Sequence, residues 1–305
     1  MTALFHLNFQ AEWIQLARPY AELLFSAFRL ATPLMFAALG GMLSERSGVI
    51  NIALEGKMLI GAFAGAAVTL ALGSGWAGLG GGALAAGALG ALYAFMTITC
   101  RANQIIAGTA INMLAYGITP FFCKILYGAT GQSPPVESAH RFLFEPVILA
   151  VVLGIVLVAF LRFTRGGLWL TMAGDHPDAL QSAGISVRAV RFGAVTAGGA
   201  LAGIGGACLS LFLASGFSRN MTAGRGFMAL AALILGKWTP TGAIIACLLL
   251  GLADAAQIRI QTTMADTGWT IPLPVVQMLP YLATLIIVAG FLGRSQPAAS
   301  LGVPR

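Results

Sequence analysis

The sequence has few charged residues and few of the side chains that perform chemistry. Only 9% of its 305 residues are Asp, Glu, Lys or Arg, against about 25% in an ordinary soluble domain. It has three histidines and four cysteines, with no C-x-x-C pair, so it predicts neither a metal site nor a disulfide framework. H-E-x-x-H, G-x-S-x-G and Walker A motifs are also missing, which argues against an enzyme and against an ATPase.

Apolar residues, by contrast, are abundant along the whole chain. They make up 58% of the sequence, and the mean hydropathy is +0.87. At about 20 residues per membrane-spanning helix, this length accommodates roughly eight to ten spans. We therefore predict an all-α, polytopic helical bundle in a membrane and exclude a soluble enzyme or a disordered chain. The net charge of +7 is typical of basic cytoplasmic loops and does not require a nucleic-acid partner.

Eight apolar segments are predicted, at 20–42, 49–72, 76–98, 104–127, 145–163, 191–214, 226–262 and 271–292. The segment 226–262 is too long for one span, and Gly236–Pro240 interrupts it, so we expect two segments there, one of which can be a half-helix. Residues 1–18 are predicted as an amphipathic stretch at the membrane surface or a short helix leading into the first span. Residues 1–305 are expected to form a single transmembrane domain.

The hydrophilic loop at about 164–191 suggests the orientation of the chain. Arginines dominate its flanks, which predicts that it lies in the cytoplasm. Counting back through the spans gives alternating sides for the earlier connections. Residues 128–144 and 73–75 are expected outside the cell, and Arg101 and residues 44–48 inside it.

Glycine pairs four residues apart occur inside the predicted spans. They are Gly61 and Gly65, Gly78 and Gly82, and Gly199 and Gly203. Such spacing allows helix backbones to approach closely in lipid. We therefore expect these glycines to lie at helix–helix contacts.

Glu55 is a carboxylate inside a predicted span. It follows Asn51 by four residues, so on a helix the two side chains would share one face. A carboxylate at the bilayer centre costs about 2.5–3.5 kcal/mol on insertion scales, so it needs a partner or a water-filled path. Two interpretations remain open, a solute pathway containing Asn51 and Glu55, or an ion pair of Glu55 with Lys57, Arg46 or Arg29.

Further polar groups are candidates for the solute pathway. Asn103, Gln104 and Asn112 cluster at the start of the span 104–127, where their amides could bind a hydroxyl-rich or purine-like solute or another helix. Arg225 lies between two glycines at the start of a predicted half-helix. Such a start can present backbone donors to a solute, although a simple interfacial arginine is the alternative.

Three blocks of sequence resemble one protein family. They are Gly40–Gly56, Gly174–Ile185, and Gly224–Ala232 followed by Gly236–Pro240. Together they look like the permease subunits of bacterial ATP-binding-cassette importers for simple sugars, branched-chain amino acids and, most closely, nucleosides. The similarity extends from about residue 20 to 292. Ala53 stands where the family usually has Gly, and Asp175-His176 replaces the commoner Glu-Asn.

The resemblance implies a function and a set of partners. Family members pair with a second permease, a paralogue or a second copy, in the bacterial inner membrane. They work with a cytoplasmic ATPase, which holds ATP and magnesium, and with an extracytoplasmic solute-binding protein. We therefore expect no cofactor in this chain and a nucleoside or related purine as solute. Simple sugars, branched-chain amino acids and a secondary transporter driven by an ion gradient are the alternatives.

The second block is similar to the cytoplasmic loop that meets the ATPase in this family. Residues 177–185 are predicted as a short amphipathic helix that begins with a proline. The resemblance implies that it docks into the ATPase, whereas the alternative is a helix lying on the membrane surface. The expected contact residues are Gly174, Asp175, His176, Pro177, Ala179, Ala183, Gly184 and Ile185.

Overall fold

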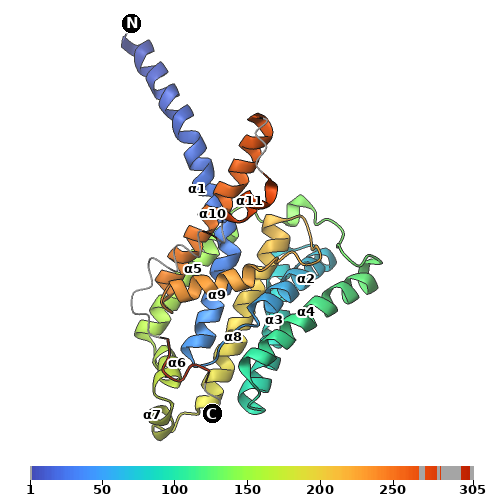
Figure 1. The fold of residues 1–305 in the computed structure, drawn as a ribbon, viewed down its shortest axis with the longest axis vertical. Helices are drawn as coiled ribbons and strands as arrows, with labels where there is room; N and C mark the ends of the chain where they lie inside the picture. Colours follow the sequence, from blue (N-terminus) through green and yellow to red (C-terminus); the bar gives the residue numbers. More distant parts are fainter. Residues whose placement is uncertain (1, 268–271, 280–281, 283–296, 303–305) are drawn as a thin grey trace. The chain divides into compact units, whose positions relative to one another are not determined.

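The computed structural model describes residues 2–267, 272–279, 282 and 297–302. Contacts between Cα atoms divide the chain into two compact units, 1–31 with 248–290 and 32–247 with 291–305. The regular structure of the described residues is helical (Figure 1), apart from one isolated bridge between Gln132 and Ser218. That residues 1–305 act as a single domain stays a prediction.

The α-helices of the described residues follow one another with short connections. They are α1 (Thr2–Arg46), α2 (Leu54–Leu72), α3 (Gly75–Ala94), α4 (Gln104–Tyr127), α5 (Glu145–Phe163), α6 (Arg165–Asp175), α7 (Pro177–Ser182), α8 (Val187–Cys208), α9 (Arg225–Leu235), α10 (Pro240–Thr267) and α11 (Leu273–Gln277). Short π-helices continue α3 through Phe95–Thr99 and α8 through Leu209–Leu213.

Seven of the described helices are long and apolar enough to cross a membrane, namely α1 from Tyr20 onward, α2, α3, α4, α5, α8 and α10. The prediction of a polytopic all-α membrane protein is therefore confirmed. The predicted break at Gly236–Pro240 is also confirmed, since α9 has only 11 residues and is too short to span a bilayer. The predicted segment 271–292 lies largely outside the described residues.

The first unit pairs the N-terminal part of α1 with the later part of α10. Of the two predictions for residues 1–18, the structure has a helix, and it runs without a break into the first span, because α1 is one helix of 45 residues. A Cβ atom placed on Gly251 would lie only 2.5 Å from the carbonyl oxygen of Ala27. Close approach of α10 to α1 within this unit therefore requires glycine at that position.

In the second unit, α2, α3 and α8 pack with their backbones almost in contact. A Cβ atom on Gly61 would overlap the carbonyl oxygen of Gly203, and a Cβ atom on Gly203 would overlap that of Gly82. Without strong hydrophobic attraction between helices in lipid, close packing of small residues supplies much of the association. The prediction that the glycines lie at helix–helix contacts is confirmed for all three pairs.

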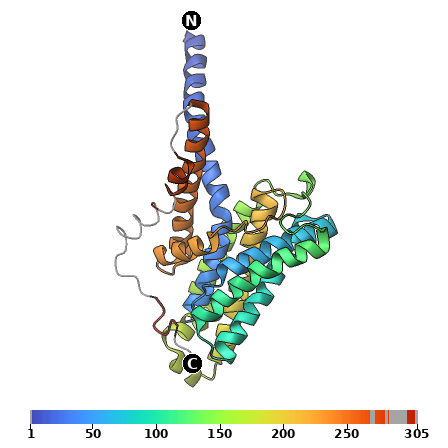
Figure 2. The same ribbon diagram turned by 45° about the vertical axis from the view of Figure 1, so that its right-hand side comes forward.

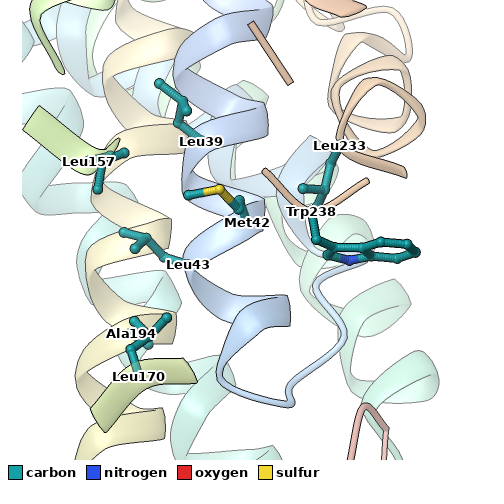
Figure 3. Packing of buried hydrophobic residues seen from close by; sticks show 8 residues of the cluster. All are labelled: Leu39, Met42, Leu43, Leu157, Leu170, Ala194, Leu233 and Trp238. Atoms are coloured by element: carbon teal, nitrogen blue, oxygen red, sulfur yellow. The ribbon is translucent and has the colours of Figure 1, made fainter. Parts of the chain in front are cut away.

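A separate apolar cluster joins five helices of the same unit. Figure 3 shows Met42 of α1 lying next to Leu233 of α9 and Trp238, with Leu157 of α5 on the other side of α1. Both Met42 and Leu233 are fully buried. The short helix α9, which runs crosswise to α8 in both views (Figures 1 and 2), is thus packed firmly against the end of α1.

The connections of this unit gather at two ends. At one end, Arg191 donates to the carbonyl of Ser47 at 2.9 Å, and the backbone N–H of Ile50 donates to Gln104 at 2.8 Å. At the other end, Phe142 donates to the carbonyl of Leu211 at 3.2 Å. Residues 44–50, 101–104 and 164–191 therefore share one end, as the alternating count of spans predicts.

Candidate solute pathway and coupling surface

The Glu55 carboxylate holds the start of α9. Its oxygens accept hydrogen bonds from the backbone N–H groups of Gly224 at 2.9 Å and Gly226 at 2.7 Å. The Tyr116 hydroxyl, halfway along α4, donates to the same carboxylate at 3.3 Å. Glu55 is fully buried. A negative charge at a helix N-terminus satisfies unpaired backbone donors and complements the helix dipole, so Glu55 stabilises α9 where it begins.

This geometry differs from the ion pair considered for Glu55. Among the described residues, neither Lys57 nor Arg46 forms an ion pair with Glu55. Lys57, which is also fully buried, donates instead to the Asn51 side chain at 2.7 Å and lies 4.6 Å from the centre of the Tyr93 ring. The backbone donors expected to face a solute at the start of the half-helix are thus occupied by Glu55.

Asn51 does not share a helix face with Glu55, and that prediction was wrong. Helix α2 begins only at Leu54, so Asn51 lies in the preceding connection. Its side chain donates to the Ser44 hydroxyl at 3.0 Å and accepts from Lys57, while its backbone N–H donates to the Glu45 carboxylate. These bonds hold the connection in a non-helical form, because asparagine side chains compete with helical hydrogen bonds.

The predicted amide cluster at the start of α4 is spread over three different environments. Asn103 is exposed and caps α4 by accepting from the backbone N–H of Ile105 at 2.9 Å. Gln104 accepts from Ile50, as described above. Asn112 accepts from the backbone N–H of Gly56 at 2.8 Å. All three amides therefore bind backbone groups, and two of them hold the segment that precedes or begins α2.

The far end of α9 is held by a second buried carboxylate. The Trp238 indole N–H donates to Glu45 Oε2 at 2.6 Å, and Arg46 donates to the Trp238 carbonyl at 3.2 Å. Glu45 is only 3% exposed. Sequence reasoning did not single out this pair as a contact. Glu45 lay inside the first family-like block, but no spacing rule connects it to a tryptophan 193 positions away.

Arg225 lies at the start of α9 in a polar environment. It is half-buried, and its guanidinium has no partner within the described part of the chain. The nearby Thr222 hydroxyl is fully buried and also unpaired. Phe227, two residues further on, is 46% exposed. Arg225 and Phe227 are therefore accessible at the start of α9, whereas the Thr222 hydroxyl is enclosed.

The helix predicted within the loop 164–191 is present as α7, which ends at Ser182. Leu180 is buried and Ala179 is exposed, so the helix is amphipathic. Within the predicted contact set, His176, Ala179, Ala183 and Gly184 are exposed, Asp175 and Ile185 are half-buried, and Gly174 and Pro177 are buried. The segment therefore presents a mostly small-residue surface at one end of the unit.

A C-terminal segment that sequence reasoning missed is bound to this surface. Ser300 bonds to the carbonyl of Gly174 through both its backbone N–H at 2.9 Å and its hydroxyl at 2.6 Å. The buried Arg191 guanidinium donates to Ser300 at 2.9 Å and to the carbonyl of Ala173 at 3.0 Å. The distant segment carries no sequence signal of this contact, because its small residues follow no periodic pattern.

Beside these contacts lies a cavity of about 550 Å³, lined by Arg46, Asp175, His176, Trp238, Pro297, Ala298 and Ala299. It joins the end of α1, the α6–α7 turn and Trp238, which lies three residues after the end of α9. Among the described residues, no group of three His, Cys, Asp or Glu side chains could hold a metal ion.

Comparison with known proteins identifies relatives of this chain. The chain is 37% identical over 299 residues to the guanosine ABC transporter permease protein NupQ of Bacillus subtilis (strain 168), covering 90% of this chain and 93% of that protein. It is 35% identical over 303 residues to the nucleoside ABC transporter permease protein NupC of Lactococcus lactis, with the same coverage of 90% and 93%.

A third relative is the putative glucose ABC transporter permease protein TsgC13 of Haloferax volcanii. It is 32% identical over 316 residues, covering 93% of this chain and 95% of that protein. No solved structure matches the chain. Residues 23–289 match the profile of a family described as branched-chain amino acid transport system / permease component. The chain therefore belongs to this family, whose members are multi-pass permease subunits of ATP-binding-cassette importers.

Proposed function

We propose that this chain imports a nucleoside or related purine solute across the inner membrane of a bacterium. The observation that carries the proposal is the similarity over nine-tenths of the chain to two permeases named for guanosine and nucleosides. A sugar is the second candidate, because a relative named for glucose is 32% identical. The family description makes branched-chain amino acids a third.

The chain would work as one subunit of a larger machine. A second permease, a cytoplasmic ATPase that binds ATP and magnesium, and an extracytoplasmic solute-binding protein complete it, while membrane lipid surrounds the spans. In support of two different permeases, a second guanosine ABC transporter permease protein of Bacillus subtilis, NupP, is 28% identical over 244 residues. Residues 1–305 would then act as one transmembrane domain without a cofactor of their own.

The solute pathway would pass the start of α9. Arg225 is the residue best placed to contact the solute, because its guanidinium is free to donate within the described part of the chain. Glu55, Asn51, Gln104 and Asn112 would shape the pathway by holding the backbone segments around it. Asn103, which is exposed beyond its cap, would lie nearer the mouth of the pathway.

The ATPase would dock on residues 174–185. Six arginines lie at the end of the unit that carries these residues, namely Arg46, Arg101, Arg162, Arg165, Arg188 and Arg191. Three basic residues lie at the opposite end, Lys124, Arg141 and Arg219. Excess arginine favours the cytoplasmic side, which supports a cytoplasmic location for the docking surface.

Uptake measurements test the proposed function. Cells with and without this gene are given labelled adenosine, guanosine, ribose or leucine, first with ATP intact and then after ATP depletion with the ion gradient preserved. We expect uptake of a nucleoside alone, dependent on both the gene and ATP. Uptake of ribose or leucine instead would overturn the solute, and uptake that persists after ATP depletion would overturn the energy source.

A further inference from the structure

Both ends of α9 are held by one stretch of chain, residues 45–55. At the start of the helix, Glu55 accepts from the backbone N–H groups of Gly224 and Gly226. At its end, Glu45 accepts from the Trp238 indole. The two carboxylates flank the connection between α1 and α2, so any displacement of that connection acts on both ends of α9.

The backbone is left-handed at each of these ends. Ala223 and Gly224 have φ angles of 44° and 84° before the helix, and Lys237 and Trp238 both have 54° after it. A left-handed residue other than glycine is strained and persists only where surrounding contacts impose it. The hinges of moving elements are a few residues at the ends of those elements that absorb changes in φ and ψ, and both pairs have such positions beside α9. The two pairs mark the points about which α9 can change its orientation.

The two ends of α9 also lie in different functional surroundings. Trp238 and Arg46 line the cavity of about 550 Å³ together with Asp175 and His176 of the α6–α7 turn. Glu55, at the other end, contacts Tyr116 halfway along α4. A helix of 11 residues is about 16 Å long at 1.5 Å per residue. Helix α9 therefore extends from the vicinity of residues 174–185, here called the coupling surface, to the middle of α4.

We propose that α9 transmits movement of the coupling surface to the solute pathway, and that Trp238 and Glu55 are the positioning residues that make this transmission tight. The inference rests on the proposed ATP-driven import but not on which solute is carried. A short rigid helix, bonded at both ends and flanked by hinge residues, moves as one body. Loss of either end contact would let the ATPase cycle without displacing the pathway end of α9.

The test measures solute molecules transported per ATP hydrolysed, in vesicles that contain the complete transporter. Trp238→Phe keeps the aromatic ring but removes the indole N–H that Glu45 accepts. Because a hydrogen bond to a buried charge is lost, we expect the ratio to fall about tenfold, with ATP hydrolysis and the amount of protein in the membrane unchanged. Trp76→Phe is the matched control, since Trp76 is 58% exposed and its ring packs edge to face with the Phe142 ring.

Glu55→Gln examines the contact at the other end of α9. If Trp238→Phe does not reach the membrane, the transport ratio of Glu55→Gln alone tests the inference. Glutamine keeps the shape but only one of the two acceptor oxygens, and it places an NH2 group against a backbone N–H donor at the helix start, so the ratio should again fall. Glu137→Gln, at a carboxylate 83% exposed, is its control. An unchanged ratio in both Trp238→Phe and Glu55→Gln would overturn the inference, provided the wild type transports a solute. If the wild type moves ribose or leucine and no nucleoside, the proposed solute fails, and the ratio is measured with the solute that is carried.

Discussion

The first two family-like blocks both resemble the permease family in sequence, but they differ in burial. The polar residues of the first block are buried, whereas much of the second block is exposed. In residues 44–57, the side chains of Ser44, Glu45, Asn51, Glu55 and Lys57 are at most 3% exposed. In residues 174–185, by contrast, His176, Ala179, Ala183 and Gly184 are exposed. The first block is enclosed by other parts of its own chain, whereas the second bonds to Ala299 and Ser300 through Asp175 and Gly174 but leaves these four residues exposed.

This difference in burial predicts different consequences of substitution in the two blocks. Substitutions in residues 44–57 leave buried partners unsatisfied, which destabilises the fold and loosens α9. Substitutions on the exposed part of residues 174–185 are expected to leave the fold intact and to act on the proposed docking of the ATPase. The same transport defect would therefore have different causes in the two blocks, and measurements of stability can tell them apart.

The largest effect is expected where the two blocks meet, at Arg191. Its guanidinium, 2% exposed, bonds to the carbonyls of Ser47 and Ala173 and to the Ser300 hydroxyl. Arg191→Met removes all of these donors. Because each buried acceptor left unpaired costs about 1–3 kcal/mol, we expect a loss of more than about 3 kcal/mol and little protein in the membrane. Immunoblots of membranes and thermal unfolding in detergent measure both.

Arg188→Met is the control for this substitution, since Arg188 is exposed on the first turn of the same helix. It should leave both the protein level and the unfolding temperature unchanged. Equal stability of the two variants would contradict the role of Arg191 as the link between the blocks.

Gly184→Arg should abolish uptake without loss of protein. Gly184 is left-handed with a φ of 81°, and nothing lies within 4 Å of an added Cβ atom. The strain costs roughly 1–2 kcal/mol, and the long charged side chain projects from the proposed docking surface. Uptake of labelled nucleoside and binding of the ATPase subunit in detergent are both measured.

Gly128→Arg provides a matched control at the opposite end of the unit. Gly128 has a φ of 71° and equally open surroundings, so it carries similar strain without lying on the docking surface. If both arginine variants take up solute equally well, residues 174–185 do not dock the ATPase. If both lose uptake equally, strain rather than docking explains the defect of Gly184→Arg.

Local signals explain which parts of the fold could be predicted. Apolar runs fixed the spans, Pro240 marked the break after α9, and Pro177 marked the start of α7. Hydropathy failed at residues 49–53, which read as part of one apolar run with α2. There, the side chains of Asn51, Ser44 and Lys57 bind one another and hold an irregular connection. Hydropathy averages cannot detect such bonds.

Long-range partners explain which parts of the site could not be predicted. Glu55 was recognised as a carboxylate that needs a partner, yet its partner is the backbone N–H of Gly226, 171 positions away. Backbone donors carry no side-chain signature. The contact between Ser300 and Arg191 spans 109 positions and involves a segment with no apolar periodicity. Only the folded chain brings these groups together.

The smallest expected effect concerns Ser300 itself. Ser300→Ala removes the hydroxyl that donates to Gly174 and accepts from Arg191, but the backbone N–H bond to Gly174 remains. Arg191 also keeps its bonds to Ser47 and Ala173. We therefore expect a loss of only about 1 kcal/mol, seen as a fall of a few degrees in unfolding temperature. Ser182→Ala is the control, because its hydroxyl bonds within the exposed helix α7. A larger loss than in Arg191→Met would mean that the C-terminal segment, rather than Arg191, joins the buried block to the exposed one.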